Sequence, residues 1–273
     1  MKILITGCNG YIGLHLCKML KEHELHGLDI HKTSASKFLT KYYSINIDEP
    51  YFLPQEYDVV VHLAALVRVG ESVKEPTRYY KTNVVGTNNT LLGVKTKEFV
   101  FGSTGAAATP TSPYAISKLK AEQDVVEYCE ENKIQYTMFR FYNVTGTDGY
   151  DATNPDGLFY KLVEAIETKQ FHIYGYDYET EDGTAIRDYV HVNEICTAIK
   201  NSFNNQTNTI ENLGHGKGYS VQTIVDTFKK VNQVDFEVIK SPRREGDPAK
   251  TILENVSKFM IELYTLEDYL KIN

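Results

Sequence analysis

The chain of 273 residues contains no tryptophan and only four cysteines, at positions 8, 17, 129 and 196. The cysteines are scattered and show none of the paired spacings that indicate a zinc site or a disulfide framework, so we predict no metal site. No run of about 18 apolar residues occurs, which argues against a membrane-spanning helix. The sequence also has no excess of basic residues. Its net charge of −7 argues against a protein that binds the nucleic-acid backbone.

Internal repeats and low-complexity tracts are also absent, and the first residues enter a strand-like run without a signal-peptide pattern. We therefore expect a cytoplasmic protein that binds neither nucleic acid nor membrane. Hydrophobic residues make up 42% and charged residues 24%, as in an ordinary globular protein with a large core.

Apolar strand-like runs alternate with helical patterns through the first half of the chain. Strands are expected at Lys2–Thr6, Glu24–Ile30, Asp58–Ala65, Glu98–Phe101 and Gln135–Phe141, and helices at about 14–23, 72–95 and 113–133. We count five or six strands and predict an α/β protein with a doubly wound parallel sheet. Residues 1–143 form the first domain, rejoined by a strand near 208–213, and residues 144–273 form a smaller, interleaved lobe. Turn-forming residues between Thr145 and Gly157 mark the change.

Glycines follow the first strand with the spacing G-x-x-G-x-x-G, at Gly7, Gly10 and Gly13. A glycine turn between a strand and a helix allows a pyrophosphate to approach the helix N-terminus closely. Asp29, which follows Gly7 by 22 residues near the end of the second strand, stands where a carboxylate can bind the adenosine ribose. The carboxylate would repel the additional phosphate of NADP, so NAD is favoured, although nearby Lys32 leaves NADP open.

The segment Ser112–Lys118 has the form of a helix start, with Ser112 as N-cap and Pro113 in the first turn. Tyr114 and Lys118 are four residues apart and therefore share a face near the positive end of the helix dipole. Such a position favours a tyrosinate. By itself, the Tyr-x-x-x-Lys spacing is expected by chance in a chain with 20 tyrosines.

Six motifs in order give the pattern its specificity: TGCNGYIG, VVHLAALVRVGES, SPYAISK, RFYNV, EDGTAIRDYVHV and PRREGD. Together they resemble the extended short-chain dehydrogenase/reductases, and the last two resemble the UDP-glucose 4-epimerases more narrowly. The resemblance implies a Rossmann-like NAD-binding domain, a nucleotide-sugar-binding lobe and a homodimer formed through the helices that contain Asn83 and Tyr114. It also implies NAD-dependent epimerisation at C4 of a UDP-hexose through a transient 4-keto sugar, and it leaves open whether N-acetylated forms are accepted.

Roles for single residues follow only from this resemblance. The catalytic residues are Tyr114, Lys118 and Thr104. The cofactor-binding residues are Gly7, Gly10, Tyr11, Ile12, Gly13, Asp29, Asn46, Ile47, Leu63, Ala64, Ala65, Asn83, Lys118 and Phe141. The substrate-binding residues are Thr104, Tyr114, Asn143, Arg187, Arg244 and Asp247.

The chain departs from the family pattern in the loop between Thr104 and Tyr114, which spans only ten residues and is shorter than usual. This shortening raises the question of whether the two hydroxyls still meet. A 4,6-dehydratase is disfavoured, because Gly105 and Ala106 follow Thr104 in place of an acid. A uronate epimerase or decarboxylase stays open, as does a non-catalytic NAD-binding sensor.

Overall fold

The computed structural model describes residues 1–272 except 32–33, 147–156 and 245–246. Lys32, most of the turn-rich segment before Gly157 and part of the PRREGD motif therefore lie outside the described residues. Contacts divide the chain into two units. Unit 1 comprises Met1–Phe141 and Ala198–Asn212, and unit 2 comprises Tyr142–Thr197 and Leu213–Asn273. None of the helices in the described ranges is long and apolar enough to cross a membrane.

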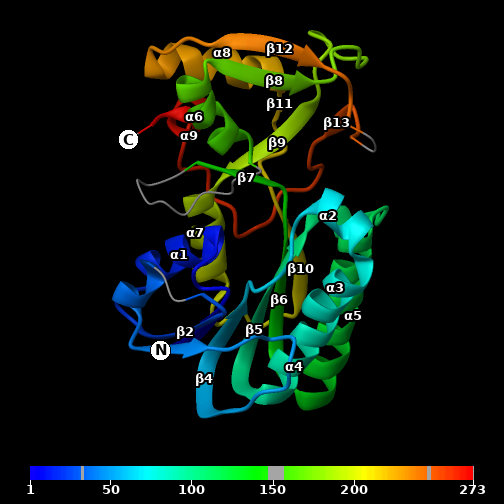
Figure 1. The fold of residues 1–273 in the computed structure, drawn as a ribbon. Coiled ribbons are helices and arrows are strands. Elements are labelled where there is room, and N and C mark those ends of the chain that lie inside the picture. Colours follow the sequence, from blue (N-terminus) through cyan, green and yellow to red (C-terminus); the bar gives the residue numbers. More distant parts are fainter. Residues whose placement is uncertain (32–33, 147–156, 245–246, 273) are drawn as a thin grey trace. The chain divides into compact units, whose positions relative to one another are not determined.

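Unit 1 is built on a seven-stranded sheet with the order β10-β6-β5-β4-β1-β2-β3 (Figure 1). Its strands are β1 (Lys2–Thr6), β2 (Glu24–Asp29), β3 (Lys41–Ser44), β4 (Leu53–His62), β5 (Val94–Thr104), β6 (Gln135–Phe141) and β10 (Thr209–Leu213). The pairings from β3 through β6 are all parallel. The order reverses between β1 and β4, so the predicted doubly wound sheet is confirmed, with seven strands rather than five or six.

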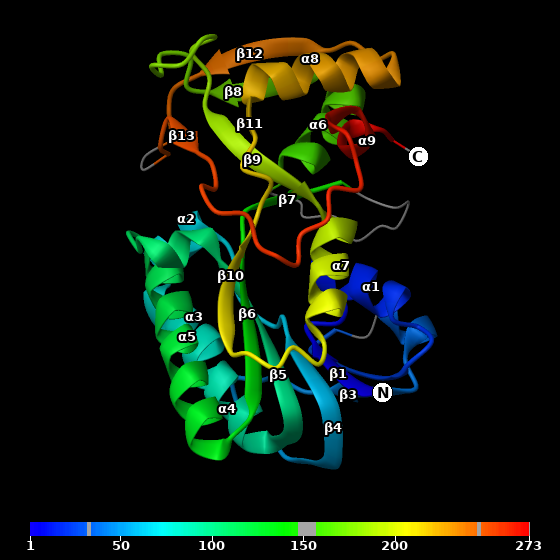
Figure 2. The same ribbon diagram turned by 180° about the vertical axis from the view of Figure 1, so that it is seen from behind.

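Helices cover both faces of this sheet. They are α1 (Tyr11–Met19), η1 (Ser34–Phe38), α2 (Val69–Lys74), α3 (Pro76–Tyr80), η2 (Lys81–Val85), α4 (Gly86–Gly93), η3 (Gly105–Ala108) and α5 (Pro113–Asn132). Crossovers in opposite directions from the β1–β4 pair carry α1 to one face and α4 and α5 to the other (Figure 2).

Two expected helices are corrected by the structure. The helix predicted over 72–95 is a series of short elements, because Pro76 ends α2 at Lys74 and starts α3, and a π-helical turn precedes α4. Its last residues belong to β5, which begins at Val94 and alternates buried and exposed side chains at first. The first helix ends at Met19 instead of His23, where the chain turns into β2.

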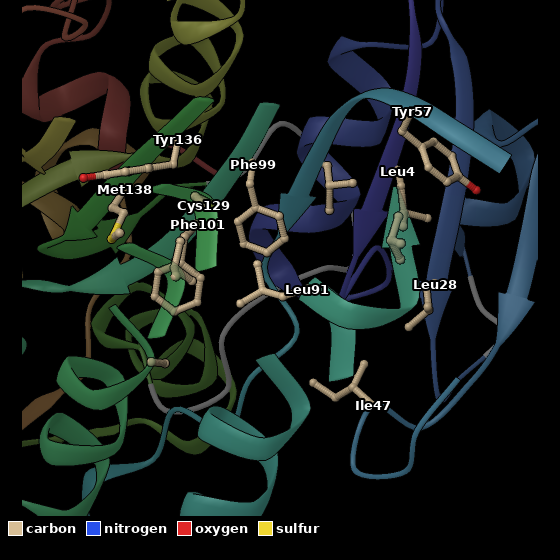
Figure 3. Close-up of a cluster of buried hydrophobic side chains, with 14 of the residues drawn as sticks. Leu4, Leu28, Ile47, Tyr57, Leu91, Phe99, Phe101, Cys129, Tyr136 and Met138 are labelled. Atoms are coloured by element: carbon tan, nitrogen blue, oxygen red, sulfur yellow. The ribbon is translucent and has the colours of Figure 1, made fainter. Parts of the chain in front are cut away.

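The core of unit 1 is a cluster of buried side chains beside the sheet (Figure 3). Leu4 and Leu28 come from β1 and β2, Phe99 and Phe101 from β5, and Met138 from β6. Burial of a side chain of this size contributes about 1.5–3 kcal/mol. The cluster therefore stabilises the central strands whose ends carry the candidate site.

Unit 2 contains a four-stranded sheet in which β11-β9-β13 are neighbours and β7 also pairs with β9, together with a separate β12-β8 pair. Its strands are β7 (Asn143–Thr145), β8 (Gln170–Tyr174), β9 (Ile186–His191), β11 (Gly218–Ser220), β12 (Glu237–Ser241) and β13 (Lys250–Thr251). Its helices are α6 (Leu158–Thr168), α8 (Val221–Asn232) and α9 (Leu266–Leu270), and α7 (Val192–Ser202) runs from unit 2 into unit 1. A second core includes Phe159, Tyr189 and Phe228.

Candidate active site

The glycine turn joins β1 to α1 with no room for side chains at two positions. Gly7 has φ +69°, and a Cβ there would lie 2.7 Å from the Ala64 nitrogen. A Cβ at Gly13 would clash with the carbonyl oxygen of Gly7. Gly10 precedes α1 without a side-chain cap, so Tyr11 and Ile12 begin a nine-residue helix at the turn. Such a helix N-terminus is suited to bind phosphate oxygens.

Asp29 ends β2 beside this turn. Its carboxylate accepts hydrogen bonds from the backbone nitrogens of Asn9 (3.0 Å) and His31 (3.1 Å). The Asn9 amide in turn donates to the His31 carbonyl. Since an ionised carboxylate has about four acceptor positions, Asp29 can hold the turn and still accept from the hydroxyls of a ribose.

Asn46 and Ile47 follow β3 and differ in exposure. Ile47 is buried, and its side chain packs against Gly86, where an added Cβ would lie only 2.7 Å away. The Ile47 carbonyl accepts a hydrogen bond from the Asn89 side chain (2.8 Å). Asn46 is exposed, and its side-chain oxygen accepts from the Asp48 nitrogen (3.0 Å). The structure therefore places Ile47 in the core and leaves the Asn46 side chain accessible.

The segment after β4 is held by a chain of polar contacts through buried His62. Thr6 Oγ1 lies 2.7 Å from His62 Nδ1 and accepts from the Ala64 nitrogen (3.2 Å), while His62 Nε2 lies 3.1 Å from Thr87 Oγ1. The Thr87 hydroxyl donates to the Asn83 carbonyl, so it can accept from Nε2–H, and Thr6 can donate to Nδ1. These roles suit a neutral ring, and burial lowers the pKa of His62 to about 3.

Asn83 joins the same segment to α5. Its oxygen accepts from the Leu66 nitrogen (2.8 Å), and its nitrogen donates to the Leu66 carbonyl (3.0 Å) and to Ser117 Oγ (2.9 Å). Ser117 donates to the Tyr114 carbonyl (2.7 Å). The resemblance assigns Asn83 to the cofactor; in this structure, two of its contacts hold Leu66 in the segment after β4, and the third reaches Ser117 at the start of α5.

Leu63 and Ala65, with Ala64 between them, follow β4, and Phe141 ends β6. Leu63 and Phe141 both lie against Gly102, where a Cβ would be 2.8 Å and 3.0 Å from their side chains. Phe141 stands opposite Thr104 in the β5–β6 register. These half-buried side chains therefore gather at the carboxyl ends of three adjacent strands, where ligands bind in doubly wound sheets.

Helix α5 begins as the sequence predicts. The Ser112 side chain accepts from the Ala115 nitrogen (3.2 Å), and Pro113 occupies the first turn. Tyr114 is 9% exposed and Lys118 is 3% exposed. The Lys118 ammonium lies 4.1 Å from the centre of the Phe101 ring. The rings of Tyr114 and Tyr79 are nearly perpendicular, with their centroids 6.4 Å apart.

The short loop after β5 still brings two hydroxyls together. Its 3₁₀ turn, η3, starts directly after Thr104, whose side chain accepts from the Ala106 nitrogen. A hydrogen bond with the Thr104 side chain also acts on the Tyr114 phenol. The abbreviated connection therefore does not separate these residues.

The protein by itself does not produce the tyrosinate that the helix position favours. Burial raises the pKa of Tyr114 to about 12, although the hydrogen bond with Thr104 opposes the increase. Burial also lowers the pKa of Lys118 to about 7, opposed by the charge of Glu122. In both cases, desolvation disfavours the charged form and outweighs the helix end and the neighbouring side chain.

In unit 2, the residues expected to bind substrate lie on β7, β9 and the segment that leads to β13. Asn143 donates to the Asp188 carbonyl (3.0 Å), and Arg187 donates to the Ile186 carbonyl (2.9 Å). The Arg244 guanidinium is exposed and stacks 4.1 Å from the Tyr174 ring centre. Asp247 is exposed, and its nitrogen donates to the Arg244 carbonyl (3.3 Å).

The adjacent arginine has a different environment. Arg243 pairs with the Asp177 carboxylate at 2.6 Å and stacks on the Tyr178 ring at 4.2 Å. This contact occupies the Arg243 guanidinium, whereas that of Arg244 is oriented by an aromatic face and keeps its donors for a ligand.

Sequence reasoning missed a buried acid in each unit. Asp188 is fully buried on β9, and its carboxylate accepts from the nitrogens of His215, Gly216 and Leu253 at 2.8–3.2 Å. Glu122 on α5 is 2% exposed and pairs with Arg140 on β6. An acid inside an apolar strand, or one turn after Lys118, is the signal that could have identified them.

Comparison with known proteins identifies related sequences and structures. Residues 3–214 match the NAD dependent epimerase/dehydratase family. The UDP-glucose 4-epimerase of Halalkalibacterium halodurans is 33% identical, over 92% of this chain and 86% of that protein. The structure of the UDP-Glc/GlcNAc 4-epimerase from Campylobacter jejuni is 30% identical with a TM-score of 0.79, covering 97% of this chain and 95% of that chain.

A second solved structure, the UDP-glucose 4-epimerase of Thermotoga maritima with UDP-glucose, is 29% identical with a TM-score of 0.84 and covers 99% of this chain and 96% of that chain. The match to the family extends over most of the sequence. The chain therefore belongs to the NAD dependent epimerase/dehydratase family.

Proposed function

We propose that this chain is an NAD-dependent epimerase that inverts C4 of a UDP-hexose, with Tyr114 as its proton-transfer group. The observation that carries the proposal is the convergence of Thr104 and Tyr114 at the carboxyl end of β5, with Lys118 buried one helical turn away. The glycine turn after β1 lies at the same edge of this sheet, the edge formed by the carboxyl ends of the strands. The names of the relatives support UDP-hexoses as the substrate class.

The residues present fit NAD. The turn at Gly7, Gly10 and Gly13 leaves backbone free of side chains at a helix N-terminus, and Asp29 has acceptor capacity for ribose hydroxyls. When bound, NAD supplies the group that exchanges a hydride with C4 and, in its oxidised form, a positive charge. The protein supplies the pocket, the orientation of the sugar and the proton transfer at the C4 oxygen.

Tyr114 takes the proton of the C4 hydroxyl when the hydride leaves and returns it when the hydride is restored. The Thr104 hydroxyl donates a hydrogen bond to the same C4 oxygen and stabilises the negative charge that develops on it. Lowering the pKa of Tyr114 from about 12 to neutrality corresponds to about 7 kcal/mol at about 1.4 kcal/mol per unit. One cation, Lys118, with a pKa of about 7, is charged for only part of the time near neutral pH.

Arg244 and Arg187 are proposed to bind the diphosphate, Asp247 the uridine ribose and Asn143 the sugar. A guanidinium fork matches two phosphate oxygens, and a carboxylate accepts from the two hydroxyls of a ribose. The stacking of Arg244 on Tyr174 supports this role, because it orients the fork without using its donors.

A homodimer is proposed through α3, η2, α4 and α5, the elements that include Asn83 and Tyr114. Exposed apolar side chains on them support the proposal: Tyr80, Val85, Leu92 and Ile116 are 37–71% exposed. A symmetric pair would remove this surface from water. Light scattering on purified protein would test it, since a monomeric mass would contradict the dimer.

The function is tested by incubating the purified protein with UDP-glucose, UDP-galactose, UDP-GlcNAc and UDP-glucuronic acid and measuring C4 epimers, with bound NAD quantified separately. UDP-glucose and UDP-galactose should interconvert without added reductant. Tyr114→Phe should reduce turnover by a factor of about 100 or more while NAD stays bound. Tyr128→Phe, on the same helix, is the matched control and should keep its activity. No turnover of any UDP-hexose would contradict the function, and unchanged turnover in Tyr114→Phe would contradict the role of Tyr114.

A further inference from the structure

A buried carboxylate lies one helical turn after Lys118, outside the set of residues assigned to substrate or cofactor. Glu122 is 2% exposed and receives three hydrogen bonds. Arg140 donates through Nε (2.9 Å) and through a terminal nitrogen (2.6 Å), and the Ser103 hydroxyl donates at 2.5 Å. Burial of a carboxylate is tolerated where charged and polar donors satisfy it in this way.

The arrangement follows from the sheet. Ser103 on β5 and Arg140 on β6 are register partners, so their side chains leave the same face next to each other. Helix α5 packs against this face and presents Glu122 to both. Phe101, two residues before Ser103 on the same strand, contacts the Lys118 ammonium. The same strand face therefore receives both Lys118 and Glu122.

Within the part of the chain that the structure describes, the other titratable groups near Lys118 carry no negative charge near neutral pH. His62 on β4 is neutral, because burial lowers its pKa to about 3. Tyr114 on the same helix is protonated, because burial raises its pKa to about 12. Arg140 on β6 is a cation. Glu122 is the group whose charge raises the pKa of Lys118 against the effect of burial.

We propose that Glu122 is a positioning residue of the catalytic site, held by Arg140 and Ser103 so that its charge favours the protonated form of the buried Lys118. The proposal deepens, and rests on, the proposed function in which Lys118 supports proton transfer by Tyr114. Ser103 and Arg140 act on Lys118 only through Glu122. The hydroxyls of Ser103 and Thr104 thus have separate tasks, one toward Glu122 and one toward Tyr114.

The direct test is an NMR titration of lysine side chains in the purified protein labelled with ¹³C and ¹⁵N lysine, with Lys118→Met identifying the signal. In the parent, Lys118 should titrate near neutrality. Glu122→Gln should lower its pKa by about one unit or more, the effect expected for removing a close opposite charge. Glu127→Gln, an exposed position on α5, should leave the pKa of Lys118 unchanged.

Glu122→Gln removes a carboxylate that pairs with the half-buried Arg140 and can fail to fold, so the double variant Glu122→Gln/Arg140→Gln is measured beside it. A lowered pKa of Lys118 in either folded variant supports the proposal. A pKa of Lys118 within about 0.3 unit of the parent value in the folded variants would overturn it. The titration needs no sugar substrate, so its outcome is separate from the assay of the proposed function.

Epimerase rates measured across pH give a second readout. Loss of the Glu122 charge should move the alkaline decline of kcat/KM to lower pH, so that the rate falls about tenfold more at pH 8 than at pH 6. An equal loss at every pH would indicate a purely structural role and would overturn the proposal.

Discussion

Replacing Asn83 by aspartate separates positioning of α5 from contact with the cofactor. The change keeps the size of the side chain and the acceptor for the Leu66 nitrogen. It removes the donor to the Leu66 carbonyl and to Ser117 Oγ, which lie 3.0 Å and 2.9 Å from the Asn83 nitrogen. It also places a carboxylate oxygen against the Leu66 carbonyl oxygen.

The magnitude follows from the two acceptors that lose their donor. Each buried polar group without a partner costs about 1–3 kcal/mol. Asn83 is fully buried, whereas Leu66 is partly accessible and Ser117 keeps its bond to the Tyr114 carbonyl. We therefore expect the free energy of unfolding to fall by about 2–4 kcal/mol. The epimerase rate should fall at least tenfold, because Ser117 lies between Tyr114 and Lys118 on α5.

The assay is urea unfolding of cofactor-free protein, which removes the stabilisation that a bound ligand adds. Asn132→Asp is the matched control, since its amide makes one exposed contact with the Tyr128 carbonyl, and it should cost less than about 1 kcal/mol. A double-mutant cycle with Ser117→Ala should give a coupling of about 0.5 kcal/mol or more. An Asn83→Asp protein that unfolds like the parent but loses NAD would refute the reasoning and assign Asn83 to the cofactor alone.

Two further predictions concern charge. Burial raises the pKa of Glu98 from 4.5 to about 7. Among the described residues, its Oε1 has no hydrogen-bond partner, while its Oε2 accepts from the Asn204 nitrogen. The folded state therefore binds the Glu98 proton more tightly than the unfolded state does. The contribution of this proton to the free energy of unfolding is complete below pH 4.5 and is lost as the pH rises to about 7. Urea unfolding should show Glu98→Gln gaining up to about 3 kcal/mol relative to the parent between pH 5 and pH 8, whereas a constant difference would contradict the titration. In the UDP-hexose assay, Arg244→Lys should raise KM about tenfold or more, because a lysine cannot form the bidentate fork. Arg243→Lys should change KM by less than about threefold, because Arg243 is paired with Asp177, and equal effects would contradict this distinction.

The sequence by itself determined the order of strands and helices around the glycine turn and the start of α5. Local chemistry is sufficient there. Gly7 allows a positive φ, and Ser112 with Pro113 defines a helix N-terminus. The spacing of Tyr114 and Lys118 on one helix face also follows from local geometry. The predicted boundaries were wrong where short-range signals conflicted, as at Pro76, which starts a new helix. They were also wrong at Val94, because pairing with β4 decides where β5 begins.

Only the tertiary structure decided what surrounds these residues. The meeting of Thr104 with Tyr114 across a short loop, and of Glu122 with Ser103 and Arg140, depends on the packing of α5 on β5 and β6. The charge states depend on it as well. Desolvation, which exists only after the chain has folded, raises the pKa of Tyr114 and lowers that of Lys118, against the expectation from the helix dipole. The residue types and their spacing were therefore readable from the chain, whereas their contacts and charges were set by burial between elements distant in sequence.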